Sequence, residues 1–168
     1  MPRDRASESE ALRYFVTAYN RSNNDQLQFI ALLEPGPPPP EPDAWCLLNG
    51  KELGVEVAHL YGTGQDAERL TKPDQQHRRN PLTEEERILN RIKPFRKRVL
   101  APLNDILRDK AEKQYRRSPV WLLVRNMFPL WLVQDFEQHK DEIAVPEYSP
   151  FQHIWLLGEH DGGLLRLR

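Results

Sequence analysis

The dipeptide Asn49-Gly50 is the feature that most constrains how this chain can fold. It separates two apolar runs, 43–49 and 51–60. Asn-Gly readily supplies the positive φ angles of a two-residue hairpin turn, so the two runs are predicted to be paired antiparallel strands. Such a turn fixes the register and places Leu48 opposite Lys51. The sequence therefore predicts a β-hairpin in which every cross-strand partner is known.

Two acids become neighbours in this hairpin. The register places Asp43 opposite Glu56, and directly opposed side chains point to the same side of a sheet with Cβ atoms about 4.5–5.5 Å apart. With a four-residue turn, Asp43 would face Ala58 and lie diagonal to Glu56, still within reach of a shared ion. Two carboxylates this close repel one another unless a cation, a proton or solvent compensates them. A hard divalent cation with oxygen ligands is the compensation that also performs chemistry.

Glu56 is unusual for its surroundings, because the run 53–58 is otherwise apolar and belongs inside a sheet. One interpretation is a buried acid with a function. The alternative is an edge strand whose Glu56 side faces water, with Asp43 merely ending the preceding proline-rich stretch. The alternation of side chains places His59 on the opposite side of the strand from Glu56 and Trp45 on the same side as Asp43.

The rest of the chain alternates between helical and extended patterns. Apolar residues at helical spacing, with Ser7 and Glu10 as a capping box, predict a helix from about Ser7 to Asn20. The other predicted elements, in chain order, are a strand over 27–33, a proline-rich connector over 34–42, the hairpin, a long loop over 62–82, a long helix that Thr83 opens and that Pro94 and Pro102 kink before it ends near Arg117, a strand over 120–127, a short helix over 130–138, and a final hairpin of 151–158 and 164–167. We therefore expect an α/β protein with a mixed central sheet flanked by helices.

Length and composition favour one domain over residues 1–168. The 168 residues are 39% apolar and 29% charged, which is enough to build a core. Trp121, Trp131 and Trp155 lie in apolar runs and are expected in that core. The first residues lack the apolar segment of a secretion signal, and no apolar run is long enough to cross a bilayer. The single cysteine, Cys46, suits a reducing compartment, so we expect a cytoplasmic protein without membrane attachment.

Basic residues concentrate in one part of the chain. Residues 72–117 hold 14 Lys and Arg against 7 Asp and Glu, although the whole chain has a net charge of -1. A cluster of cations of this kind can contact nucleic-acid phosphates. The candidate contacts are Arg78, Arg79, Arg87, Arg91, Lys93, Arg96, Lys97 and Arg98. The alternative is an ordinary solvated helix face.

Pro42-Asp43, followed by a short strand, a turn and the run 54–58, resembles the signature of the PD-(D/E)xK nuclease superfamily. The predicted element order is also similar to that superfamily's core of helix, three-strand meander, helix and strand. The resemblance implies a restriction-endonuclease-like core and a Mg²⁺- or Mn²⁺-dependent nuclease that hydrolyses phosphodiester bonds of DNA or RNA, with DNA the more expected partner. By resemblance, Asp43 and Glu56 hold the metal, and Glu8 on the first helix is a third candidate ligand.

The chain departs from the family pattern at the lysine, because Ala58 occupies the expected position. In some members of the superfamily this lysine lies on a neighbouring element. Lys110 falls in the middle of the apolar stripe that 99–107 form on the long helix, so helical geometry directs it at the sheet. A lysine there can instead lie at the edge of the core with its amine in water. Lys51, at the turn, is a lesser alternative, and Lys113 and Gln114 lie one turn beyond Lys110.

Two other functions remain open. The missing lysine favours a catalytically inactive nuclease-like domain that acts as a nucleic-acid-binding or protein-interaction module. A third interpretation is a subunit of a homodimer, or a protein that works with a partner protein, through its Trp-bearing strands. An apolar patch on the sheet edge or on the last hairpin would mark such an interface.

Overall fold

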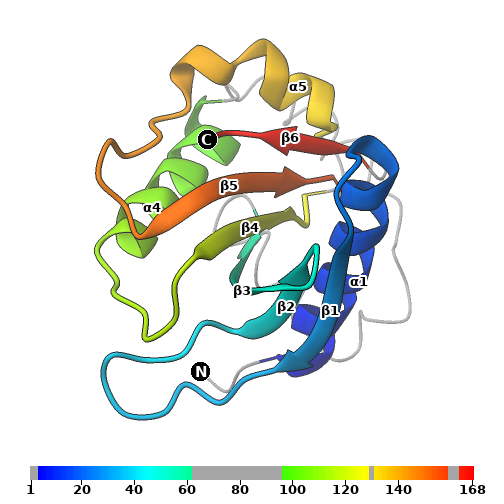
Figure 1. Ribbon diagram of the computed structural model, residues 1–168. Coiled ribbons are helices and arrows are strands. Elements are labelled where there is room, and N and C mark those ends of the chain that lie inside the picture. Colours follow the sequence, from blue (N-terminus) through cyan, green and yellow to red (C-terminus); the bar gives the residue numbers. More distant parts are fainter. Residues whose placement is uncertain (1–3, 62–95, 129–130, 159–162) are drawn as a thin grey trace, which may run out of the picture.

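The computed structural model describes residues 4–61, 96–128, 131–158 and 163–168 (Figure 1). Its centre is a six-stranded mixed sheet with helices on both faces, which confirms the predicted α/β class. The spatial order of the strands follows the chain, β1-β2-β3-β4-β5-β6. The strands are β1 (Leu27–Leu32), β2 (Ala44–Leu48), β3 (Lys51–Leu60), β4 (Val120–Asn126), β5 (Phe151–Leu157) and β6 (Leu164–Arg166). Strands β3, β4 and β5 are parallel, whereas β1-β2-β3 and β5-β6 pair antiparallel.

The hairpin forms as predicted. Asn49 and Gly50 have φ angles of 51° and 79°, as a two-residue turn between twisted strands requires. The register runs from Leu48 opposite Lys51 to Ala44 opposite Val55. Strand β3 then continues beside β4, so it lies inside the sheet. The edge-strand alternative for Glu56 is therefore wrong.

The first helix begins and ends slightly outside the predicted range. Helix α1 spans Arg5–Ser22, and its N-cap is Asp4, whose side chain accepts a hydrogen bond from the Ser7 backbone amide at 3.1 Å. The predicted capping box of Ser7 and Glu10 is wrong, because Asp4 already serves the first turn and Ser7 lies within the helix.

The predicted long helix ends earlier in the chain than expected. A π-helical turn, Arg96–Leu100, leads into α4 (Ala101–Ala111), with Pro102 in the first turn, where a missing amide costs little. The helix ends at Ala111 instead of near Arg117, because the following residues run beside the proline-rich connector. The Arg116 backbone amide donates to the Pro40 carbonyl at 2.9 Å. The predicted start of this helix and the predicted loop 62–82 lie outside the described residues.

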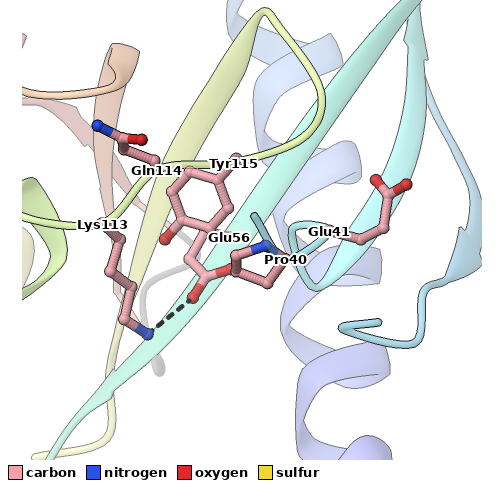
Figure 2. Close-up of a pocket in the computed structure, with 6 residues that line it drawn as sticks. All are labelled: Pro40, Glu41, Glu56, Lys113, Gln114 and Tyr115. Carbon is pink, nitrogen blue, oxygen red and sulfur yellow. Dashed lines mark ion pairs between the residues drawn. The ribbon is translucent and has the colours of Figure 1, made fainter. Parts of the chain in front are cut away.

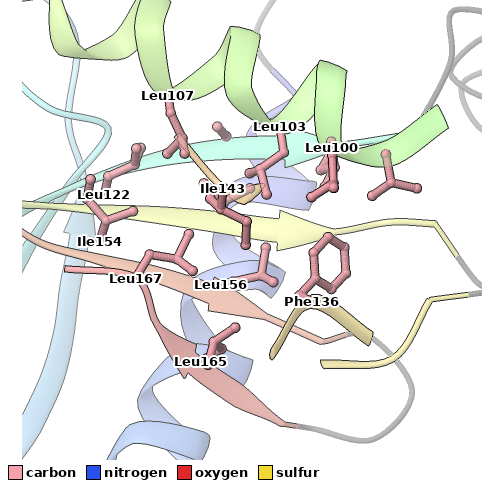
Figure 3. Packing of buried hydrophobic residues seen from close by; sticks show 14 of the residues in the cluster. Leu100, Leu103, Leu107, Leu122, Phe136, Ile143, Ile154, Leu156, Leu165 and Leu167 are labelled. Atoms are coloured by element: carbon pink, nitrogen blue, oxygen red, sulfur yellow. The ribbon is translucent and has the colours of Figure 1, made fainter. Parts of the chain in front are cut away.

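Two hydrophobic cores lie on the two faces of the sheet. Helix α1 covers one core, where Phe15, Tyr19, Trp121 and Trp155 pack together. On the other face, α4 and the short helix α5 (Val133–Gln138) cover a core of mainly aliphatic side chains (Figure 3). Helix α5 starts three residues later than predicted and is followed by a short 3₁₀ helix, Lys140–Glu142.

The buried tryptophans bear on the proposed partner interface. Trp121 and Trp155 are 2% and 8% exposed, so these two side chains offer little surface to a partner. Trp131 is half-buried and packs against the aliphatic core. Among the described helices, none has the length and apolar character needed to cross a membrane.

Candidate active site

Asp43 and Glu56 are two buried acids at the end of the hairpin. They are the next residues outward from the Ala44–Val55 pair and are only 3% and 2% exposed. Ala44 and Val55 belong to the core under α1, so alternation directs Asp43 and Glu56 to the face covered by α4. The Val57 backbone amide donates a 2.8 Å hydrogen bond to Asp43 Oδ2, which holds this carboxylate against β3.

The Pro42 ring packs closely on the Gly54 backbone at the same end of the hairpin. Gly54 lies under the Pro42 ring, and a Cβ atom added at Gly54 would come within 2.6 Å of Pro42 Cγ. Real Cβ atoms do not approach so closely, so glycine is required here for steric reasons. The Pro42-Gly54 contact therefore sets how closely the residue before Asp43 packs on β3.

Helix α4 brings a lysine to Glu56. The Lys110 ammonium donates a 2.6 Å hydrogen bond to Glu56 Oε1, and its side chain is 20% exposed. Lys113 Nζ lies 3.7 Å from the same oxygen. The other oxygen, Glu56 Oε2, is buried and has no hydrogen-bond partner among the described residues. The structure thus brings Lys110 into contact with one of the two predicted metal ligands.

A small pocket opens beside this ion pair. It has a volume of about 270 Å³, and its walls come from three segments: the proline-rich connector, β3 and the residues that follow α4 (Figure 2). The lining residues are Pro40, Glu41, Glu56, Lys113, Gln114 and Tyr115. Figure 2 shows the Lys113 ammonium directed at the Glu56 carboxylate from the segment that follows the helix. Lys113 and Gln114, expected one helical turn beyond Lys110, therefore line the pocket although the helix has already ended.

The lysines and acids form one electrostatic cluster. The pKa of Lys113 is lowered, first by burial and then by the neighbouring Lys110 charge, while Glu56 and Asp43 act in the opposite direction. The pKa of Lys113 thus depends on both acids and on the second lysine. Four ionisable groups, from β3, α4, the residue before β2 and the segment after α4, thus interact electrostatically at this site.

Other predicted site residues lie elsewhere. Ala58, at the position where the nuclease resemblance predicts a lysine, is 8% exposed and packs in the core beneath α4. Lys51 is exposed at the turn. Glu8 is half-buried on α1, the helix that covers the opposite core. Within the described residues, no three His, Cys, Asp or Glu side chains gather to hold a metal, so Glu8 does not complete a three-acid cluster.

The predicted nucleic-acid contacts fall mostly outside the described structure. Five of them lie outside the described residues: Arg78, Arg79, Arg87, Arg91 and Lys93. For Arg96 and Lys97 only the helical backbone is described. The Arg98 guanidinium lies over the Phe128 ring, 5.4 Å from its centroid. The role of this basic set stays a prediction.

A third buried charged residue, besides Asp43 and Glu56, was not predicted from the sequence. Arg125, on β4, is 1% exposed, and its Nη1 donates a 2.8 Å hydrogen bond to Glu10 on α1. His59 is paired with Arg125 in the sheet register and faces away from Glu56, as predicted. Burial, and then the Arg125 charge, lower the pKa of His59. The signal was an arginine that directly follows the apolar run 120–124.

Trp45 lies beside a cation. The Arg117 guanidinium is 5.7 Å from the centroid of its ring. The same guanidinium donates through Nε to Glu41 at 2.8 Å, so Arg117 links the proline-rich connector to β2. Trp45 thus lies near one wall of the pocket, as expected for a residue that shares the face of Asp43.

No protein-family model, curated protein or solved structure matches this chain.

Proposed function

We propose that this protein is a metal-dependent phosphodiesterase that acts on nucleic acid, with Asp43, Glu56 and Lys110 as its catalytic residues. One observation carries the proposal. Two buried carboxylates lie at adjacent ends of one hairpin, and a lysine from the helix covering that face contacts one of them. A buried acid pair of this kind costs stability and is typical of functional sites.

The connectivity supports the same proposal. Helix α1 precedes the antiparallel strands β1, β2 and β3, and α4 then leads to β4, which is parallel to β3. This order resembles the restriction-endonuclease-like core of the PD-(D/E)xK nucleases. It also resembles them in placing one acid directly before the second strand of the meander and the other on the third strand.

The residues at the site fit a hard divalent cation such as Mg²⁺ or Mn²⁺. Asp43 and Glu56 offer carboxylate oxygens, and Glu56 Oε2 has no hydrogen-bond partner among the described residues. Magnesium is commonly held by only one or two protein carboxylates together with substrate phosphates, so two acids suffice. When bound, such an ion polarises a phosphoryl oxygen and lowers the pKa of a bound water.

The chain's own residues have separate roles around these acids. The Val57 amide holds Asp43 in place, and the Lys110 ammonium orients Glu56 through its hydrogen bond. Lys110 also places a positive charge where negative charge develops on the phosphoryl group in the transition state. The basic residues 78–98 are proposed to contact the nucleic-acid backbone, which predicts binding that weakens steeply with salt.

The alternative is a nuclease-like domain without turnover, and a specific observation favours it. Ala58 replaces the family lysine in the apolar core, and the Lys110 ammonium already compensates the charge of Glu56. In that case the acid pair is a remnant and the domain binds nucleic acid or protein without cleaving it.

Nuclease assays distinguish the two functions. Purified protein is incubated with single- and double-stranded DNA and RNA, with Mg²⁺, with Mn²⁺ or with chelator. We expect metal-dependent cleavage that Asp43→Asn and Glu56→Gln abolish, whereas Glu137→Gln, an exposed acid on α5, keeps full activity. Cleavage that persists in both site variants contradicts the assignment of the site. Metal-independent binding without cleavage of any substrate favours the inactive module.

A further inference from the structure

Lys110 and Lys113 share one carboxylate oxygen unequally. Lys110 Nζ lies 2.6 Å from Glu56 Oε1, within hydrogen-bond range, whereas Lys113 Nζ lies 3.7 Å from the same atom. Hydrogen bonds between nitrogen and oxygen extend to about 3.2 Å, so the Lys113 contact to Glu56 is an ion pair without a hydrogen bond. One carboxylate charge is therefore compensated directly by Lys110, with Lys113 held nearby.

The two lysines also differ in their access to the pocket. The Lys113 side chain is 48% exposed and lines the pocket, whereas Lys110 is 20% exposed and is not among the lining residues. The Lys113 ammonium is therefore in the pocket wall, where a group that enters the pocket can contact it (Figure 2). Lys113 can form a hydrogen bond with such a group without breaking one to Glu56, because it makes none.

The acids in the pocket wall each have another cation. Glu56 accepts from Lys110, and Glu41 Oε2 accepts from Arg117 Nε at 2.8 Å. Among the described residues of the pocket wall, Lys113 is thus a cation that makes no hydrogen bond to either acid of the wall. The volume of about 270 Å³ lies just below the range of about 300–1,000 Å³ found for drug-sized ligands, so the pocket suits a small group.

We propose that Lys113 binds a phosphoryl oxygen of the substrate in this pocket, while Lys110 stays on Glu56. This inference rests on the proposed function and makes Lys113 a substrate-binding residue distinct from Lys110. Both ammonium groups lie within 3.7 Å of Glu56 Oε1, so an anion bound in the pocket reduces the repulsion between them. A phosphoryl group offers the charge-assisted hydrogen bonds that an ammonium favours.

Phosphate binding can be measured without any cleavage. The full chain is titrated with inorganic phosphate and with a nucleoside monophosphate, each with chelator and with Ca²⁺, and binding is followed by NMR of backbone amides. The variants are Lys113→Ala, Lys113→Arg and, as a matched control, Lys140→Ala, an exposed lysine outside the pocket wall. We expect Lys113→Ala to weaken nucleotide binding about tenfold, or about 1.4 kcal/mol, whereas the other two variants bind like the wild type.

The outcomes separate this inference from the proposed function. Nucleotide binding that depends on Lys113, in a protein that cleaves no nucleic acid, supports the phosphate site and contradicts the phosphodiesterase. Cleavage that requires Asp43 and Glu56, together with nucleotide binding that Lys113→Ala leaves unchanged, supports the phosphodiesterase and overturns the role of Lys113. Absence of nucleotide binding to the wild type, or binding of inorganic phosphate alone, also overturns it.

Discussion

Two buried charges lie on opposite faces of the same sheet, and their surroundings differ. Glu56 on β3 faces α4, and Arg125 on β4 faces α1. Each has an ion-pair partner on the helix that covers it, at 2.6 Å for Lys110 and 2.8 Å for Glu10. The Arg125 guanidinium also lies 5.5 Å from the centroid of the Tyr14 ring, so residues of one helix cover it from two sides.

Glu56 has a different arrangement of partners. Two lysines approach one of its oxygens, the other oxygen has no hydrogen-bond partner in the described part of the chain, and the side chain lines a pocket. Arg125 Nε is also buried without such a partner there, but the Tyr14 ring covers the group and Arg125 is not among the residues of that pocket. The comparison indicates that the pair of Arg125 and Glu10 attaches α1 to the sheet. At Glu56, by contrast, two lysines approach a single carboxylate, although one is enough to compensate its charge.

Removal of Lys110 has the largest expected effect on stability. Lys110→Met leaves Glu56 as a buried charge with only Lys113 nearby, and breaking a buried pair of this kind costs about 3–5 kcal/mol. We expect about 3 kcal/mol, because Lys110 is partly exposed and Lys113 remains; urea unfolding measures the change. In the double variant Glu56→Leu with Lys110→Met, the loss should shrink below about 1 kcal/mol. A double variant as unstable as Lys110→Met would mean that the ion pair exists for folding.

The hairpin geometry gives the next largest effect. Gly54→Ala introduces a Cβ atom 2.6 Å from Pro42 Cγ, and overpacking of this kind costs about 1–3 kcal/mol. Thermal unfolding of Gly54→Ala, Pro42→Ala and the double variant tests the contact. The double variant should recover most of the loss, since alanine at position 42 removes the atom that clashes. An unchanged loss in the double variant would show that the Pro42 ring is not the cause.

The Glu10 pair on the α1 side should respond less than the Lys110 pair. Glu10→Gln keeps the shape of the side chain and removes its charge from beside Arg125. Because the Glu10 side chain is 51% exposed, water can replace part of the interaction, and we expect a loss of about 1–2 kcal/mol in urea unfolding. A loss as large as that of Lys110→Met would break the contrast between the two faces.

The pH dependence of stability gives the smallest expected effect. The pKa of His59 is lowered from 6.5, first by burial and then by Arg125, while Asp4 and Glu10 oppose the shift. The unfolded chain therefore binds the proton more readily, so the free energy of unfolding falls as pH drops below about 6.5. His59→Asn should flatten this slope in unfolding measured across that range. His153, whose pKa is also lowered by burial, contributes with the same sign, and His153→Asn measures its share.

The sequence predicted the parts of the site that depend on local rules. The Asn49-Gly50 turn and strict alternation placed Asp43 and Glu56 together, and helical spacing directed Lys110 at the sheet. The predicted N-cap of α1 was wrong. Asp4 and Ser7 are both residue types that cap helices, and only the backbone geometry shows that Asp4 is the cap. Glu10 was interpreted as a capping acid, although it pairs with Arg125, 115 residues away in sequence.

By itself, the sequence determined the turn, the register and the faces of β2 and β3, because turn chemistry and side-chain alternation act between residues close together in the chain. Only the tertiary structure decided that α4 ends at Ala111 and that the next residues pass beside Pro40. That path places Lys113 in the pocket wall next to Glu56. It depends on contacts between segments more than 50 residues apart, such as the ion pair of Glu56 with Lys110, and no local pattern encodes them.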